Sequence, residues 1–279
     1  WRLDTAYEMG YDILRELTAA AHAEKPGSLV VGEIVNYPAR WLQSLDAVMG
    51  FTFRLTILGV VGGTISPAAA GRMLARMVND AGIEPLLRSW LMIDNHDLPR
   101  IAWLLPVLSQ RRIAQALQFS LPGAPNIYYG SEVGMTGGPD PENRAPMRWD
   151  LLHDANPELI WMRQLIALRK TQRALRIGDF RLIEAEHLLA FERYTDRALE
   201  TVIAVANPSV SPVRETVMVA NPSLMDVTPM VDLLSPASTP SICSIEAGLL
   251  HLNVPPETIY LLQPREQELG GYSRYKRVE

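Results

Sequence analysis

The sequence reads Trp-Leu-Met-Ile-Asp-Asn-His-Asp at residues 90–97, a short apolar run that ends abruptly in polar and acidic groups. Two similar junctions lie upstream, where short apolar runs end at Asp4 and at Glu33. The intervals are 29 residues from Asp4 to Glu33 and 64 residues from Glu33 to Asp97. One strand-helix unit of a (β/α)8 barrel takes roughly 30 residues, so these intervals correspond to one unit and two units. We therefore expect the three acids at the C-terminal ends of parallel strands, the face where such barrels hold their active sites.

Helical periodicity and short apolar runs alternate through the first part of the chain, which predicts a parallel sheet built from βα units. Asn156 followed by Pro157 is typical of a helix N-cap with proline in the first turn. The predicted helices cover residues 7–23, 68–78, 109–120 and 157–173. The predicted strands lie within residues 1–4, 29–34, 47–49, 90–93 and 125–130.

After about Gly178 the helical periodicity ends, and short strand-like runs separated by turn residues follow, which favours an antiparallel β-sandwich. These runs are residues 180–186, 188–194, 201–207, 215–220, 230–235, 242–246, 249–254 and 258–263. The predicted organisation is a barrel part over residues 1–177, a sandwich domain over 178–265 and a polar tail over 266–279.

Composition narrows the class of protein. The 279 residues are 48% hydrophobic and 20% charged, which is ordinary for a globular chain. A net charge of −5 argues against nucleic acid as a partner and fits a neutral or polar substrate. No apolar stretch reaches the length of about 18 residues that a membrane span needs. The single cysteine, Cys243, excludes an internal disulfide and a cysteine-based metal cluster.

The acidic junctions resemble, in order and spacing, three signature motifs of the α-amylase superfamily, glycoside hydrolase family 13. Residues 122–135 look like the eighth-strand region of that family, and residues 140–150 look like the loop after it. The resemblance covers the whole chain and implies strands four to eight of a (β/α)8 TIM barrel, followed by the family's β-sandwich. Glu8, Arg100 and residues 41–49 are more similar to the neopullulanase and cyclomaltodextrinase group.

The resemblance implies a role for each acid in retaining glycoside hydrolysis. Asp4 would be the nucleophile that forms a covalent glycosyl-enzyme intermediate. Glu33 would be the general acid and then the general base, so it must start the reaction protonated. Asp97 would bind sugar hydroxyls and stabilise the transition state. Without the resemblance, any single acid at a strand end is more often a loop cap than a catalytic group.

Four further residues would bind or orient the substrate by the same resemblance. Arg2 lies two residues before Asp4, so on a strand both point to the same face, and its cation would keep Asp4 ionised. His96 would donate a hydrogen bond to a sugar hydroxyl. Asp140 and Arg144 match the pair that holds a further glucose unit, with a surface ion pair as the equal alternative.

The activity that the resemblance implies is hydrolysis of α-1,4 links, and as a second possibility α-1,6 links, in α-glucans, maltooligosaccharides or cyclodextrins. Two alternatives stay open. One is a transglycosidase or isomerase such as a trehalose synthase, because the chemistry of the three acids would be the same. The other is a non-catalytic carbohydrate-binding subunit, although such relatives are expected to lose catalytic acids and this chain keeps all three.

The residues resemble only the later part of the family's barrel, so we expect a C-terminal portion of a longer protein. The missing strands would come from another polypeptide or from a second copy, unless the chain is a fragment. We expect weak or no turnover by the chain alone. We also expect no cofactor and no metal, because many calcium ligands of the family lie in the segments that are absent here. The neopullulanase-like details favour the cytoplasm.

Overall fold

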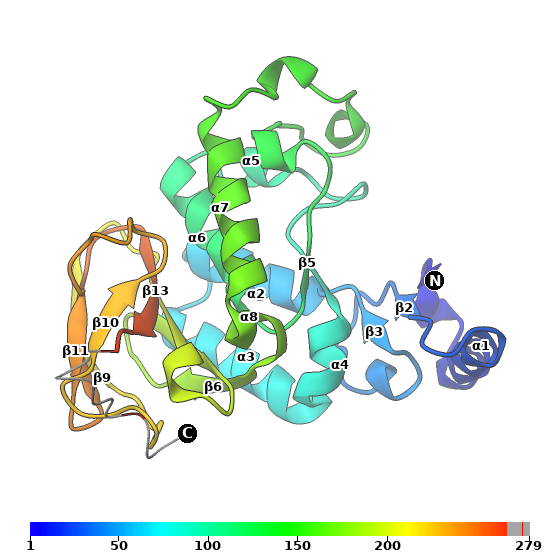
Figure 1. Ribbon diagram of the computed structural model, residues 1–279. Coiled ribbons are helices and arrows are strands. Elements are labelled where there is room, and N and C mark those ends of the chain that lie inside the picture. The colour runs from blue at the N-terminus through cyan, green and yellow to red at the C-terminus, as the bar shows by residue number, and fades with distance from the viewer. Residues whose placement is uncertain (267–274, 276–279) are drawn as a thin grey trace.

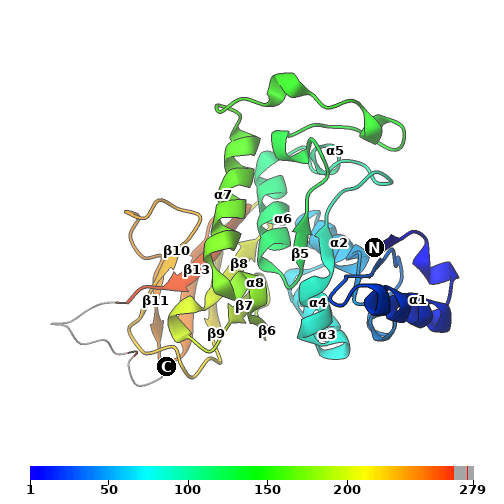
Figure 2. The ribbon, with the colours of Figure 1, turned by 45° about the vertical axis from the view of Figure 1, so that its right-hand side comes forward.

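The computed structural model describes residues 1–266 and residue 275 (Figures 1 and 2). Five short parallel strands follow one another in chain order in the described part. A three-stranded sheet and a two-stranded sheet are joined by a parallel bridge between Met49 and Trp90. The strands are β1 (Arg2–Leu3), β2 (Val31–Gly32), β3 (Ala47–Val48), β4 (Trp90–Met92) and β5 (Ala124–Asn126). The arc is open, because no described strand pairs with the outer edge of β1 or of β5.

Helices connect and cover these strands, and four of them confirm the helices predicted from the sequence. The predicted N-cap is also observed, since the Asn156 side chain accepts a hydrogen bond from the Glu158 amide at 2.9 Å. The α-helices are α1 (Tyr11–Glu24), α2 (Phe51–Val61), α3 (Pro67–Ala81), α4 (Ile83–Arg88), α5 (Ile101–Leu104), α6 (Leu108–Ser120), α7 (Pro157–Thr171) and α8 (Arg173–Ile177). The short 3-10 helices are η1 (Ala6–Glu8), η2 (Trp41–Gln43), η3 (Ser131–Val133), η4 (Glu142–Arg144), η5 (Trp149–Leu151) and η6 (Ala198–Glu200).

The second part of the chain is an eight-stranded antiparallel sheet in the order β6-β7-β8-β13-β10-β11-β12-β9. Its strands are β6 (Asp179–Ile183), β7 (Leu189–Tyr194), β8 (Val202–Asn207), β9 (Val213–Met218), β10 (Pro229–Asp232), β11 (Cys243–Glu246), β12 (Leu249–Val254) and β13 (Thr258–Pro264). Each of the eight predicted runs overlaps one of these strands. The sheet curls, so that Val205 of β8 and Leu250 of β12 share one buried core. The predicted tail lies outside the described residues except for Glu266 and Tyr275.

The two parts of the chain share a second apolar core, in which helices α2, α3, α6 and α7 meet strands β7, β8 and β13. The sheet lies at the left of Figure 1, beside these helices, while the N-terminus and α1 lie at the far right. None of the helices in the described part combines the length and the apolar character that a membrane span requires.

A fully buried arginine ties the sheet to the helices at this junction. The Arg193 guanidinium donates to the carbonyl oxygens of Ser120 at 2.8 Å, Gly178 at 2.7 Å and Asp179 at 3.1 Å. A fourth contact reaches the Leu175 carbonyl oxygen at 3.3 Å. Burial lowers the pKa of Arg193 to about 9, so the side chain remains charged at neutral pH. One side chain therefore satisfies carbonyl groups at the ends of α6 and α8 and at the start of β6.

Replacing Arg193 with Leu is expected to destabilise the fold by about 4 kcal/mol, because buried carbonyl groups lose their donor. Urea unfolding followed by circular dichroism measures the change. Arg197→Leu, in the connection between β7 and β8, is the matched control, because its side chain is largely exposed and its ion pair with Glu200 is 3.7 Å long. That control should stay within about 0.5 kcal/mol of the parent. Equal losses in the two variants would contradict the assignment.

Candidate active site

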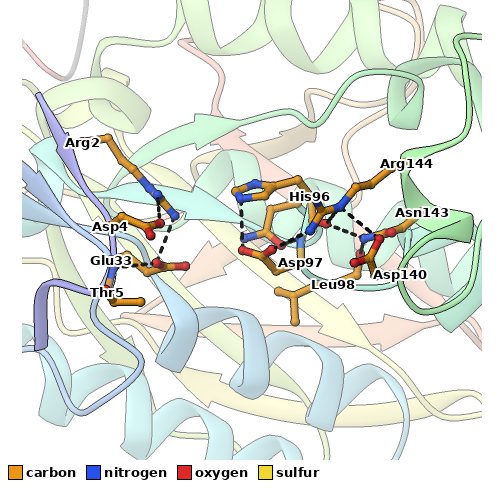
Figure 3. A network of polar contacts seen from close by, with 11 residues as sticks. Arg2, Asp4, Thr5, Glu33, His96, Asp97, Leu98, Asp140, Asn143 and Arg144 are labelled. Atoms are coloured by element: carbon orange, nitrogen blue, oxygen red, sulfur yellow. Dashed lines mark hydrogen bonds and ion pairs between the residues drawn. The ribbon is translucent and has the colours of Figure 1, made fainter. Parts of the chain in front are cut away.

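Asp4 and Glu33 are neighbours because their strands are in register. Leu3 of β1 pairs with Gly32 of β2, so the next residue of each strand leaves the sheet at the same C-terminal edge. The Arg2 guanidinium forms an ion pair with Asp4 and places Nη2 3.0 Å from Glu33 Oε2 (Figure 3). The Asp4 side chain is 72% exposed, whereas that of Glu33 is 10% exposed. The structure therefore holds an open carboxylate and a buried carboxyl group against one cation.

Thr5 donates a hydrogen bond to the Glu33 carboxyl group, in addition to the ion pair with Arg2. Its backbone amide donates to Glu33 Oε2 at 3.0 Å, the same oxygen that contacts Arg2. Thr5 adopts a left-handed conformation with φ 41° and ψ 38°. A β-branched residue rarely adopts this conformation, and the strain costs of order 1–3 kcal/mol. The turn that follows β1 thus directs an amide at Glu33, a contact that no sequence pattern indicated.

A second group of polar side chains comes from the loops after β4 and β5. Asp97 accepts contacts from His96 Nε2 at 3.1 Å and from Arg144 Nη2 at 3.1 Å. The Arg144 Nε atom lies 3.2 Å from Asp140 Oδ1 and donates to the His96 carbonyl oxygen at 2.9 Å. Figure 3 shows this group facing the pair of Asp4 and Glu33, with Asp97 nearer to that pair than Asp140 is.

A cavity of about 440 Å³ lies between the two groups and is lined by Asp4, Thr5, Tyr7, Glu33, Val35, His96, Asp97 and Arg144. The structure thus brings together five of the seven predicted site residues at one surface. Arg2 contacts two of the lining acids without lining the cavity itself. Asp140 lies outside the lining and is connected to it through Arg144. The sequence reasoning did not identify Thr5, Tyr7 or Val35 as cavity residues, although each lies within three residues of a predicted acid.

Asp94, at the start of the loop that carries His96 and Asp97, has a different environment. It is 3% exposed and accepts hydrogen bonds from the Ile101 amide at 2.9 Å and the Ser131 hydroxyl at 2.6 Å. Burial raises the pKa of Asp94, against the opposing effect of these hydrogen bonds and of the Arg100 and Arg54 charges. The two hydrogen bonds of Asp94 therefore connect the start of this loop to its end at Ile101 and to Ser131 in the segment after β5.

Within residues 1–266 and 275, no three side chains of histidine, cysteine, aspartate or glutamate are arranged to hold a metal ion. The expectation that the chain binds no calcium stays a prediction.

Parallel βα units with two acids at the ends of neighbouring strands are typical of barrel enzymes. Comparison with known protein families identifies the family. The sequence model of the protein family described as the alpha amylase catalytic domain matches residues 8–162 of this chain. The chain belongs to the alpha-amylase family.

Individual relatives agree with the neopullulanase and cyclomaltodextrinase group that the motifs indicated. Cyclomaltodextrinase of Geobacillus thermopakistaniensis is 35% identical over 225 residues, which cover 75% of this chain and 36% of that protein. Neopullulanase 2 of Thermoactinomyces vulgaris is 31% identical over 203 residues, 69% of this chain and 34% of that protein. The chain spans about a third of the length of these curated relatives.

A solved structure supports the fold alone. The debranching enzyme of Nostoc punctiforme in its native form superposes with a TM-score of 0.82 at 24% identity, over 94% of this chain and 57% of that chain.

Proposed function

We propose that this chain carries the catalytic acids of a retaining glycoside hydrolase that acts on α-1,4-linked glucans or maltooligosaccharides. The observation that carries the proposal is the cation shared by Asp4 and Glu33 at a cavity that Asp97 lines from the other side. Retaining enzymes hold their two carboxyl groups about 5–5.5 Å apart, and inverting enzymes hold them farther apart. One guanidinium in contact with both groups supports the closer arrangement.

In the first step, a carboxylate oxygen of Asp4 attacks the anomeric carbon from the face opposite the leaving sugar. The bond from that carbon to the leaving oxygen breaks, and the leaving oxygen takes the proton of Glu33. Both contacts described for the Glu33 carboxyl group use Oε2, so Oε1 is the oxygen suited to carry this proton. The product is a glycosyl ester on Asp4.

In the second step, water attacks the anomeric carbon, and Glu33 removes its proton as the new bond forms. The ester bond to Asp4 breaks, which restores the free carboxylate and the protonated Glu33. Asp97 binds hydroxyls of the reacting sugar and His96 donates to a neighbouring hydroxyl. Arg144 orients Asp97 and, together with Asp140, contacts the next glucose unit.

The proposal includes the place of this chain in the family fold. Residues 1–177 would be strands four to eight of the barrel, with β1 as strand four, and residues 178–265 would be the β-sandwich domain. The chain-order arc of β1 to β5 and the curled antiparallel sheet support this division.

Product analysis tests the function. The natural protein, meaning this chain together with any further segments that it carries in the cell, is incubated with maltotriose and with a cyclodextrin. Proton NMR identifies the anomer that is released first. Only shorter sugars, released first as the α-anomer, are expected. Longer or rearranged sugars would indicate a transglycosidase or isomerase. Binding without cleavage, unchanged in Glu33→Gln, would indicate a carbohydrate-binding subunit.

The 279-residue chain on its own is expected to turn over maltooligosaccharides at least roughly 100-fold more slowly than a cyclomaltodextrinase assayed beside it. Nothing in the described part covers the outer edge of β1, so Asp4 is held from one side only, and displacement by about 1 Å has an effect of this size. Reducing-sugar release measures the rate. A rate equal to that of the cyclomaltodextrinase would contradict this expectation.

A further inference from the structure

Asn143, on η4 in the loop after β5, is fully buried although its side chain is polar. Its amide nitrogen Nδ2 donates to the carbonyl oxygen of His96 at 2.8 Å and to that of Leu98 at 3.1 Å. These two carbonyl groups lie on either side of Asp97, so one amide holds the backbone before and after that acid (Figure 3). Asn143 itself does not line the cavity.

Other hydrogen bonds act on the same short segment. The Asp97 amide donates to Asn95 Oδ1 at 3.0 Å, and Arg144 Nε donates to the His96 carbonyl oxygen at 2.9 Å. The direction of the Asp97 carboxylate depends on this backbone, because a short side chain follows its own peptide groups closely. Asn143 is the member of the network that is removed from solvent and joins both flanking carbonyls.

The chemistry of the position favours an amide over other side chains. Two carbonyl oxygens require two donors, which an asparagine NH₂ group supplies. An aspartate of the same shape would present an ionised oxygen to them. The Oδ1 atom of Asn143 is buried and has no hydrogen-bond partner in the described part of the chain, which is a cost to the fold. The two hydrogen bonds that Asn143 donates, to the carbonyl groups of His96 and Leu98, offset that cost.

We propose that Asn143 is a positioning residue for Asp97: it fixes the backbone of the loop after β4 so that the acid faces the reacting sugar. The inference rests on the proposed function for its effect on catalysis. Its structural part, the restraint of residues 96–98, is independent of that function.

The chain offers a matched control for this residue. Asn156 is 5% exposed and its Nδ2 atom donates to the Val133 carbonyl oxygen at 3.1 Å and to the Leu151 carbonyl oxygen at 2.8 Å. It is therefore a second buried asparagine whose amide nitrogen donates to two backbone carbonyl groups, in the same long segment after β5. Its side-chain hydrogen bonds in the described part of the chain go to Val133, Leu151 and Glu158 and not to the loop that carries Asp97.

Kinetics of the natural protein test the catalytic part, at temperatures where all variants are folded. Asn143→Ala is expected to lower kcat by about 10- to 100-fold with little change in KM, the effect of a small displacement of a catalytic group. Asn156→Ala is expected to lower the melting temperature and to keep the parent kcat. Equal kcat values in the parent and in Asn143→Ala, or equal losses in both alanine variants, would overturn the proposal.

The pH profile of Asn143→Asp separates positioning from a general loss of stability. An ionised carboxylate only accepts hydrogen bonds and repels the two carbonyl oxygens, whereas a protonated one donates a single bond to them. The ratio of kcat for Asn143→Asp to kcat for the parent should therefore rise as the pH falls. The ratio for Asn143→Ala should stay level. Parallel profiles of the two variants would count against the proposal.

Hydrogen-deuterium exchange in the 279-residue chain tests the structural part without any assay of activity. Asn143→Ala should speed exchange of the amides of residues 95–99, and Asn156→Ala should speed exchange near residues 151–158 and leave residues 95–99 unchanged. If the natural protein cleaves no glucan and the exchange result still holds, the proposed function fails and the restraint by Asn143 stands. Unchanged exchange at residues 95–99 would overturn the restraint itself.

Discussion

Glu33→Gln is expected to lower kcat/KM for maltotriose by roughly 10²- to 10⁴-fold in the natural protein, the usual contribution of a general acid. Glutamine keeps the size of the side chain, and its amide oxygen still accepts from the Thr5 amide. It has no acidic proton for the leaving oxygen, so the sugar would have to leave as an alkoxide.

The dependence on the leaving group makes this prediction specific. A glucosyl fluoride needs little help from an acid, so its first step in Glu33→Gln should stay close to that of the parent. The matched control is Glu8→Gln, because Glu8 is an exposed glutamate on η1 that does not line the cavity. An equal loss for maltotriose and for the fluoride would contradict a role in proton transfer.

Asp4→Ala is expected to lower kcat for the same substrate by on the order of 10⁴- to 10⁶-fold, as loss of an enzymic nucleophile does. Without the carboxylate no glycosyl ester forms, and the Arg2 guanidinium retains only Glu33 as its partner. The alanine side chain leaves room on the face opposite the leaving group, where the cavity is open to solvent.

A small anion should use that room. Azide is expected to restore cleavage of a glucosyl fluoride by Asp4→Ala and to form the β-glucosyl azide, because it attacks opposite the leaving α-fluoride. Chromatography and NMR identify the anomer. Asp12→Ala is the control, since Asp12 is an acid of similar exposure on α1 whose side chain pairs with Arg15. An α-azide formed by Asp4→Ala would contradict the assignment of Asp4 as the nucleophile.

The sequence predicted the strand ends well, for a physical reason. Parallel strands bury both faces, so they appear as short apolar runs, and a polar group can follow only where the strand leaves the sheet. Asp4 and Glu33 directly follow paired strand residues, as the periodicity indicated. Asp97 lies five residues beyond β4, within the loop that leads to α5, and the sequence pattern did not indicate that distance from the strand.

Helix α2 was missed because its residues are apolar on every side. Seven of its eleven residues are buried, so the amphipathic periodicity that marks a surface helix is absent. Its buried Arg54 donates to the Ile93 carbonyl oxygen at 2.6 Å. This hydrogen bond offsets part of the cost of burying a charged side chain in an otherwise apolar helix.

The remaining features depend on tertiary contacts between distant segments. The roles of Asn143 and Arg193 come from carbonyl groups far away in the chain, 47 residues away for His96 and 73 for Ser120. The left-handed conformation of Thr5 opposes the local preference of threonine and is held by its surroundings. Local propensity carries no signal for any of these three residues.

The guanidinium of Arg2 touches both Asp4 and Glu33, so a single cation is shared by two carboxyl groups. In the proposed cycle the ester on Asp4 is neutral, so the whole attraction of Arg2 then falls on Glu33. When the ester is cleaved, the cation is shared by both carboxyl groups again. One arginine therefore serves as the counter-charge of the nucleophile in one half of the cycle and contacts only Glu33 as a charged partner in the other.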